Sequence, residues 1–160
     1  MLRTALLCLM MTALPLASHA APLNAQLTQR TVMNLSVIKQ IAAAAEAEAR
    51  KNNWNVSIAI VDEGGQLVHF IRMDDSPNSS VMVSQGKARH AANYRRDTKF
   101  HQEVLEKGNI AALALPDSLP IEGGVRLVAD GKVIGAIGVS GVQAAQDAQI
   151  ARAGAALLKE

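Results

Sequence analysis

Residues 122–141 read EGGVRLVADGKVIGAIGVSG and contain two extended runs, Val125–Ala129 and Lys132–Ser140, which only Asp130 and Gly131 separate. An Asp-Gly pair between apolar runs predicts a β-hairpin, because the tight two-residue turn requires positive φ at its centre. The stretch therefore predicts two adjacent antiparallel strands, and the rest of the chain is interpreted outward from them.

The second of these strands has two unlike faces, because alternate residues of a strand point to opposite sides of the sheet. One face is mostly branched and is typical of a hydrophobic core: Val133, Gly135, Ile137 and Val139. The other face is mostly small: Ile134, Ala136, Gly138 and Ser140. Glycine inside a strand indicates the close approach of another backbone, a helix or a ligand. The pattern therefore predicts that either a helix or a planar ligand covers the small face.

The remaining chain has hydrophobic periodicities that predict a β-α-β-β-α-loop-β-β-α order. The strands expected before the hairpin are Thr28–Met33, Val56–Val61 and Gln66–Met73. The expected helices run from an N-cap at Ser36 to Asn52, from Ser79 to Arg96, over a further turn from Thr98 to Lys107, and over Ala144–Leu158. These elements predict an α/β (α+β) fold with an antiparallel sheet of about five strands flanked by helices.

Residues 1–20 have the features of a secretory signal peptide. Arg3 precedes an apolar run at residues 5–16, which is too short to span a membrane, and a small-residue cleavage site follows. We expect cleavage at the end of this segment, a single domain over residues 21–160, and a periplasmic or secreted location. Cys8 is the only cysteine and would be removed, so the mature chain would have no thiol for a disulfide or a metal site.

The composition argues against a nucleic-acid-binding protein. The formal net charge is +2 at pH 7, and aromatic residues make up only 2% of the chain. These aromatic residues do not alternate with a basic stripe, as a nucleic-acid surface would require. No second long apolar run follows the signal segment, so no membrane span is expected after cleavage. A core rich in alanine and glycine must close by tight packing, which also favours close contacts between subunits.

The segment KARHAANYRRDT, which begins at Lys87, contains the densest group of candidate functional residues. Lys87, His90 and Tyr94 are spaced at i, i+3 and i+7, so they share one face of the predicted helix. Histidine and tyrosine can ligate iron, and arginines such as Arg95 and Arg96 bind carboxylates through paired hydrogen bonds. The alternative interpretation is a solvated basic helix.

Other candidates have simpler structural explanations. His69 is expected to be a partly buried sheet residue, and His101 a surface residue near a helix end. The backbone N–H groups of residues 122–124 could face an anion. The glycines at 135, 138 and 141 lack the spacing of a dinucleotide-binding loop. We assign no catalytic residue, because no nucleophile elbow, zinc-spaced cluster or carboxylate pair stands out. No residue pattern in the sequence supports an enzymatic activity.

Four segments, in this order, resemble the GlcG/HbpS family of haem-binding proteins, which includes the C-terminal domain of PduO. They are NNWNVSIAIVDEGGQLV from Asn52, RMDDSP from Arg72, KARHAANYRRDTK from Lys87, and the stretch from Glu122 to Leu158. The resemblance covers residues 35–158 and is closest to the GlcG branch. It implies a profilin-like sheet flanked by helices, assembly into homo-oligomers, and haem as a ligand. Some members are described as degrading haem or sensing it with a partner kinase.

Two residues depart from the family pattern: His90 replaces the threonine of K-A-R-T-A-A, and Arg126 replaces the proline of G-G-V-P. His90 either adds a ligand or fills space, and Arg126 either anchors a propionate or points into solvent. By motif position, the resemblance implies that five residues line the ligand pocket: Lys87, Arg95, Arg96, Gly123 and Gly124.

We therefore hypothesise a periplasmic or secreted homo-oligomer that stores, scavenges or presents haem. His90 or Tyr94 would ligate the iron, and Lys87, Arg95 or Arg96 would neutralise the propionates. One alternative is a binding or accessory protein for a small organic acid such as glycolate, held by the arginines and the amides of Gly123 and Gly124. The other is a non-catalytic module that only forms oligomers or docks a partner. The sequence identifies no sensor partner.

Overall fold

The computed structural model describes residues 22–159. The chain divides into two units, Met1–Arg30 and Thr31–Glu160. The described part of the first unit contains a short 3₁₀ helix, η1 (Leu23–Gln26). The predicted signal peptide lies outside the described residues. Among those that are described, no helix is long and apolar enough to cross a membrane.

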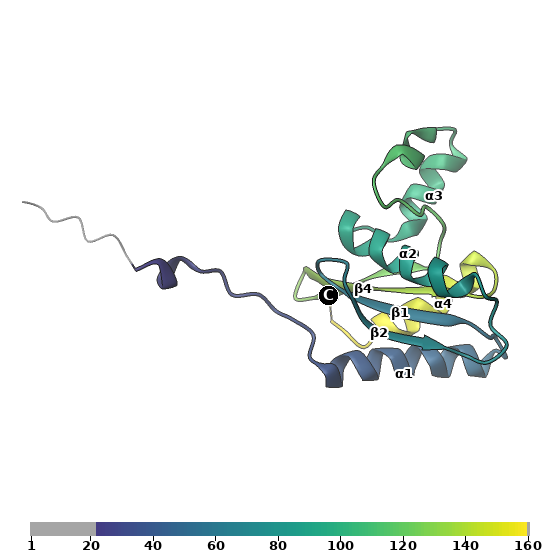
Figure 1. Ribbon diagram of the computed structural model, residues 1–160, viewed down its shortest axis with the longest axis horizontal. Helices are drawn as coiled ribbons and strands as arrows, with labels where there is room; N and C mark the ends of the chain where they lie inside the picture. The colour runs from purple at the N-terminus through teal and green to yellow at the C-terminus, as the bar shows by residue number, and fades with distance from the viewer. Residues whose placement is uncertain (1–21, 160) are drawn as a thin grey trace, which may run out of the picture. The chain divides into compact units, whose positions relative to one another are not determined.

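The second unit is built on a four-stranded antiparallel sheet (Figure 1). Its strands are β1 (Ser57–Asp62), β2 (Leu67–Arg72), β3 (Gly124–Ala129) and β4 (Lys132–Ser140). The order across the sheet is β2-β1-β4-β3, so the two predicted hairpins lie side by side with β1 and β4 in the centre. The central position of β4 explains its nearly complete burial.

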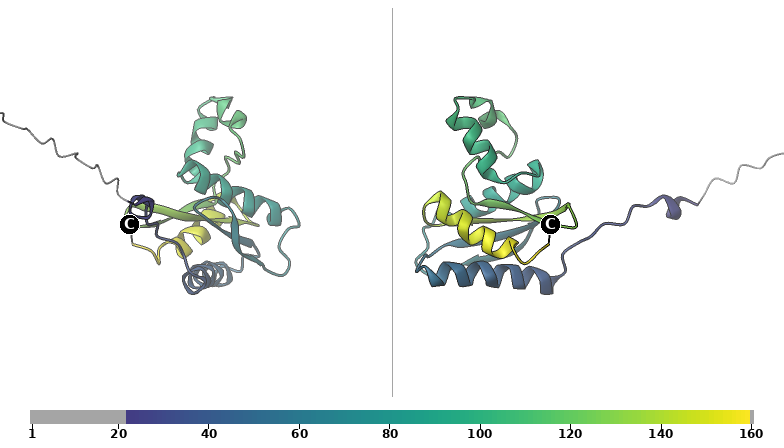
Figure 2. Two further views of the ribbon diagram at one scale, coloured as in Figure 1. Left: turned by 60° about the vertical axis from the view of Figure 1, so that its left-hand side comes forward. Right: turned by 180° about the vertical axis from the view of Figure 1, so that it is seen from behind.

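Helices cover both faces of this sheet. On one face lie α1 (Leu35–Lys51) and α4 (Ala144–Ala155), and on the other lies α2 (Ser80–Tyr94) (Figures 1 and 2). On the α2 side, α3 (Thr98–Glu106) and a 3₁₀ helix, η2 (Ile110–Ala114), extend away from the sheet. This arrangement confirms the predicted α+β class of an antiparallel sheet flanked by helices.

The predicted hairpin turn is confirmed in detail. Asp130 has φ of 48° and Gly131 has φ of 72°, and Ala129 pairs with Lys132 across the turn. Positive φ at both central residues gives the turn the twist that matches the flanking strands.

A helix, and not a planar ligand, covers the small face of β4. A Cβ atom placed on Gly138 would lie 2.1 Å from the carbonyl oxygen of Ser84 and 2.4 Å from the amide nitrogen of Ala88, both in α2. Small side chains fill the rest of this layer: Ala59, Val61, Ala88, Ala91, Ala92 and Ala136. The opposite face packs on α1 and α4 through branched side chains: Ile58, Ile60, Leu127, Ile137 and Val139. The first of the two alternatives for this face is therefore correct.

The prediction for Ile134 was wrong, because the strand contains a β-bulge. Leu127 pairs with Gly135, but the next residue, Val128, pairs with Val133, which leaves Ile134 as an extra residue. An extra residue shifts the alternation of side chains by one position. Ile134 is therefore buried in the branched core and does not share the small face.

The sheet has four strands, and the predicted strand at 28–33 does not form. Residues 27–32 are exposed and pair with no strand, and strand preference depends on packing against such neighbours. Met33 instead packs against the core as a single side chain. The following helix begins earlier than predicted, because Asn34 is its N-cap and accepts a 3.0 Å hydrogen bond from Val37 N.

Candidate functional site

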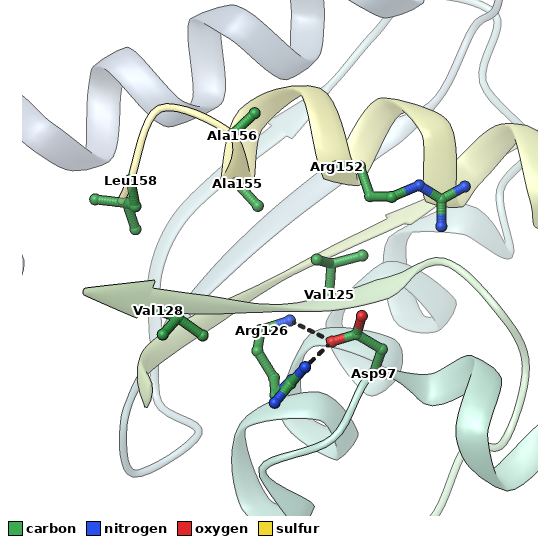
Figure 3. Close-up of a pocket in the computed structure, with 8 residues that line it drawn as sticks. All are labelled: Asp97, Val125, Arg126, Val128, Arg152, Ala155, Ala156 and Leu158. Atoms are coloured by element: carbon green, nitrogen blue, oxygen red, sulfur yellow. Dashed lines mark hydrogen bonds and ion pairs between the residues drawn. The ribbon is translucent and has the colours of Figure 1, made fainter. Parts of the chain in front are cut away.

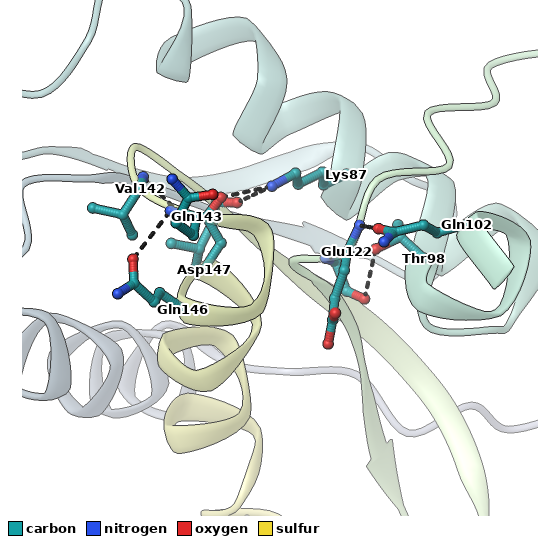
Figure 4. A network of polar contacts seen from close by, with 10 residues as sticks. Lys87, Thr98, Gln102, Glu122, Val142, Gln143, Gln146 and Asp147 are labelled. Carbon is teal, nitrogen blue, oxygen red and sulfur yellow. Dashed lines mark hydrogen bonds and ion pairs between the residues drawn. The ribbon is translucent and has the colours of Figure 1, made fainter. Parts of the chain in front are cut away.

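Lys87 is buried and holds together helices from opposite faces of the sheet. Its Nζ lies 2.8 Å from Asp147 Oδ2 in α4 (Figure 4). It also donates a 3.1 Å hydrogen bond to the carbonyl oxygen of Val139. Asp147 is equally buried, and its other oxygen accepts from Val142 N at 3.2 Å. Burial raises the pKa of the Asp147 carboxyl, and the Lys87 ammonium group opposes that rise.

Gly123 and Gly124 provide the space that Lys87 occupies. A Cβ atom on Gly123 would lie 2.6 Å from Lys87 Nζ, and one on Gly124 would lie 2.3 Å from the Lys87 carbonyl oxygen. Gly123 also has φ of 127°, a conformation that favours glycine. The N–H of Gly124 donates a 2.9 Å hydrogen bond to Thr98 Oγ1, so it does not face an open anion site.

The start of α3 covers the open edge of the sheet. Strand β3 is an edge strand, and an edge exposes unpaired backbone groups that can pair with other chains. Here Gly124 N donates to Thr98 Oγ1 at 2.9 Å, and Arg126 N donates to Asp97 Oδ1 at 3.1 Å. Arg126 Nε also donates to Asp97 Oδ1, at 2.9 Å. Asp97 occupies the N-cap position of α3 but makes no capping hydrogen bond, because its carboxylate binds Arg126.

Glu122 is a second link between α3, the sheet and α4. Its backbone N–H donates to Gln102 Oε1 at 2.6 Å (Figure 4). Its buried carboxylate lies 3.6 Å from Lys99 Nζ and 3.4 Å from Arg152 Nη1. Two cations therefore surround a carboxylate that is mostly removed from water.

His90 and His101 form a buried pair between α2 and α3. His90 Nε2 lies 2.8 Å from His101 Nδ1, and His90 Nδ1 accepts a 2.8 Å hydrogen bond from Leu119 N. His90 is fully buried, and His101 is 9% exposed. Both ring nitrogens of His90 are therefore occupied. The prediction that His101 lies at the surface was wrong, because the pair buries it.

Both histidines are held in the neutral form. Burial, and then the neighbouring His101, lower the pKa of His90 to about 4. Burial, and then the positive charge of Arg96, lower the pKa of His101. A buried imidazole that gains a proton must carry a charge in a region with little water, which explains both directions.

Tyr94 completes an aromatic cluster under α3. Its ring centre lies 4.9 Å from that of His90 and 5.3 Å from that of His101, and its hydroxyl donates to the carbonyl oxygen of Pro116. Arg95 is exposed and ends α2 in a left-handed conformation, with φ of 49°. Arg96 is also exposed, and its guanidinium lies 4.3 Å from the ring centre of Phe100.

Three hollows lie in this part of the molecule. The first, of about 370 Å³, lies between β3 and α4, with Arg126 and Arg152 beside the apolar residues Val125, Val128 and Leu158 (Figure 3). The second, called the basic hollow, has a volume of about 300 Å³; three cations, Arg96, Lys99 and Arg126, line it together with Phe100 and two carboxylates, Asp97 and Glu103. The third, called the α3 groove, has a volume of about 240 Å³ and includes Phe100, His101, Val104, Ala112 and Leu115. Within residues 22–159, no three His, Cys, Asp or Glu side chains converge as they would to hold a metal ion.

Comparison with known proteins identifies the family. Residues 33–156 match the family described as "Haem degrading protein HbpS-like". The chain belongs to the HbpS-like family. GlcG of Escherichia coli strain K12 is 46% identical over 111 residues, which span 69% of this chain and 83% of GlcG. This finding confirms the resemblance inferred from the four sequence segments.

Solved structures of HbpS-like proteins share the fold. A double mutant of Streptomyces reticuli HbpS superimposes with a TM-score of 0.77 at 31% identity, over 93% of this chain and 99% of that protein. A PduOC–haem complex superimposes with a TM-score of 0.74 at 26% identity, over 81% of this chain and 96% of that one. The helices and the four-stranded sheet are therefore those of the family.

In this HbpS-like chain, the predicted site residues lie in three groups. Lys87, Gly123 and Gly124 come together, but in the closed polar link to Asp147. His90 and Tyr94 come together under α3, while Arg95 and Arg96 are exposed near the end of α2. The predicted roles of all these residues in ligand binding stay predictions. His69 is partly buried in β2, as predicted.

The sequence interpretation did not predict the distant contacts of four residues that organise these sites: Asp97, Thr98, His101 and Asp147. The Asp-Thr pair at 97–98 is a recognisable helix start, but its contacts lie in a strand far along the chain. No local pattern indicates the partners of His101 and Asp147, because each pairs with a residue on another helix.

Proposed function

We propose that this protein binds haem and stores, scavenges or presents it as a periplasmic or secreted homo-oligomer. Membership of the HbpS-like family is the observation that carries the proposal. The PduOC relative was crystallised as a haem complex, which supports haem as the ligand of this chain. The signal-peptide pattern at residues 1–20 supports export.

The surface around α3 fits the chemistry of haem. Haem is a flat apolar molecule with two carboxylates, so it requires an apolar surface beside cations. The basic hollow offers Arg96 and Lys99, while its third cation, Arg126, is already paired with Asp97; the adjoining α3 groove offers apolar side chains. Phe100 lines both, which makes the two surfaces continuous. We therefore propose that haem lies over Phe100 with its propionates toward the basic hollow.

The predicted iron ligands are both engaged in hydrogen bonds. His90 uses one nitrogen for Leu119 and the other for His101, and the Tyr94 hydroxyl donates to Pro116. Iron ligation by His90 or Tyr94 therefore requires the loop that carries Pro116 and Leu119 to move. A double replacement, His90→Ala with Tyr94→Ala, tests this role through the Soret band of the bound haem.

The test of haem binding is a titration of the protein recovered after expression of the full chain. We expect a saturable Soret band with a fixed ratio of haem to subunit. Mass spectrometry is expected to show cleavage after Ala20, and light scattering an oligomer. The pair Arg96→Ala with Lys99→Ala is expected to weaken binding by about tenfold or more, since each bond to a charged group contributes roughly 1.5–3 kcal/mol.

Lys39→Ala is the matched control, because Lys39 is an exposed cation on α1, away from this surface. Its haem affinity should equal that of the unaltered protein. Binding that rises without saturation would show that haem associates only non-specifically with this protein. An unchanged affinity in the Arg96 and Lys99 variant would contradict the proposed position of the propionates.

A further inference from the structure

The α3 groove contains two polar side chains, His101 and Asn109, among apolar ones. His101 lines the groove together with Phe100, Val104, Ala112 and Leu115, and it is 9% exposed. Its Nδ1 is bonded to His90, so Nε2 is its only remaining polar atom. In the part of the chain that the structure describes, Nε2 has no protein partner. Nε2 is not one of the buried unpartnered side-chain atoms, which in the described residues are Ser76 Oγ and Ser118 Oγ, so it stays open to solvent and to a ligand in the groove.

The hydrogen bonds behind His101 determine which of its nitrogens carries the proton. The backbone N–H of Leu119 can only donate, so the Nδ1 atom of His90 that it contacts must accept. The proton of neutral His90 is therefore on Nε2, which donates to His101 Nδ1. The proton of neutral His101 must then be on Nε2. The chain of hydrogen bonds presents an N–H donor, and not a lone pair, at the groove.

The charges around His101 favour an anionic acceptor. His90 lies behind it on α2, Tyr94 beside it, and Phe100 on its own helix α3. The cation that acts on it is Arg96, whose positive charge lowers the pKa of His101. A neutral N–H donor near a guanidinium attracts a carboxylate, while the apolar side chains of the groove accept a hydrocarbon ring.

We propose that the α3 groove binds a small apolar carboxylate, of the size of a single-ring aromatic acid, whose oxygen accepts a hydrogen bond from His101 Nε2. The binding residue is His101, and His90 and the Leu119 amide position it. This site overlaps the α3 groove proposed for haem, but it takes a different ligand and requires no metal.

Two measurements test the inference on the unaltered protein. Two-bond ¹H–¹⁵N spectra of the histidines are expected to show the proton on Nε2 of both His90 and His101. Titration with benzoate is expected to give saturable shifts at His101 Nε2 and at the Ala112 and Leu115 amides. Phenyltrimethylammonium, which has the ring but neither an acceptor nor a negative charge, is expected to shift none of them.

Variants separate the hydrogen bond from mere packing. His101→Phe keeps a ring without a donor and is expected to weaken benzoate binding by about tenfold or more. His101→Gln keeps a donor and is expected to retain part of the affinity, and it serves where the phenylalanine variant does not fold. His69→Phe, in β2 and outside the groove, is the matched control and should leave benzoate binding unchanged.

Any of three results overturns the inference. They are a His101 Nε2 that carries no proton, groove resonances that do not shift when benzoate is added, and a His101→Phe variant that binds benzoate as tightly as the unaltered protein. Haem titration of the unaltered protein keeps the two proposals apart. A saturable Soret band without benzoate binding rejects the groove site and retains haem. Benzoate binding without a saturable Soret band retains the groove site and rejects haem.

Discussion

The two sides of α2 are packed in opposite ways. Toward the sheet, α2 meets β4 through glycine and alanine, and its backbone approaches Gly138 so closely that no Cβ fits. Toward α3, the same helix uses polar and aromatic groups: the His90–His101 hydrogen bond and the bond from Tyr94 to Pro116. The first contact depends mainly on shape, with the Lys87 link to Val139 and Asp147 as its main polar element. The second depends on a few directional bonds.

This difference means that the sheet side of α2 serves to hold the fold together, whereas the α3 side leaves surfaces on which a ligand could bind. The sheet side is closed, since small residues bring backbones into direct contact and leave no room for a planar ligand. The α3 side keeps the basic hollow and the α3 groove, because short hydrogen bonds hold α3 without filling the space around it. A steric change on the sheet side should therefore unfold the domain, whereas a polar change on the α3 side should act locally.

The largest effect is expected from Gly138→Val. The added side chain would overlap the backbone of α2 at Ser84 and Ala88, and neither backbone atom can rotate away. The loss should exceed the roughly 1–3 kcal/mol typical of overpacking and unfold the domain. Circular dichroism with urea denaturation should show no cooperative transition. Gly64→Val is the control, because Gly64 is exposed; a folded Gly138→Val protein would show that α2 can move off the sheet.

The next largest loss of stability is expected from Lys87→Met. It leaves the Asp147 carboxylate buried without its partner, a change that costs roughly 3–5 kcal/mol. Urea denaturation measures the loss. Adding Asp147→Leu should restore much of the stability, since an apolar pair needs no compensating charge. If the double variant is as unstable as the single one, the ion pair is not the reason that α2 and α4 stay together.

The parts of the fold that follow from neighbouring residues were predictable. Asp130-Gly131 specifies its hairpin because the turn conformation depends on those two residues, and alternation identified the small face of β4 correctly except at Ile134. That exception comes from a bulge, which depends on pairing with β3. Such pairing is not contained in the periodicity of one strand.

The candidate site was less predictable, because its partners are distant in sequence. Helical spacing placed Lys87, His90 and Tyr94 on one face. The contacts of these side chains, however, depend on Asp147 and on the loop at Pro116. The turn at Arg95 places the start of α3 at the sheet edge, and this path brings His101 to His90. The spacing of residues along a helix predicts the direction in which a side chain points, but it does not predict the distant residue that the side chain contacts.

The third effect is a pH dependence on the α3 side. The pKa of His90 is about 4 in the folded chain, below its usual value of ~6.5 in an unfolded one. Below pH 6.5 the unfolded chain therefore binds a proton that the folded chain does not, so stability falls toward pH 4 and this contribution then levels off. The difference corresponds to about 3 kcal/mol.

The measurement is urea denaturation from pH 7 to pH 4 for the unaltered protein and for His90→Asn, which does not titrate. The unaltered protein should lose more stability over this range than the variant, and the difference separates the hydrogen-bonded His90–His101 pair from other groups such as Asp147. Parallel curves for the two proteins would show that His90 is not held neutral by burial against α3.

The smallest effect is expected from Thr98→Val, which keeps the shape of the side chain and removes the hydroxyl that receives Gly124 N. An unsatisfied buried N–H costs about 1–3 kcal/mol, and we expect the lower part of this range because the edge of the sheet can admit water. Thr31→Val, at an exposed position, is the control. Amide hydrogen exchange should accelerate in α3 and at the β3 edge but not in the part of α2 that packs on Gly138. Acceleration spread evenly over both sides of α2 would mean that the polar contacts stabilise the whole domain and that α3 is not a separately held element.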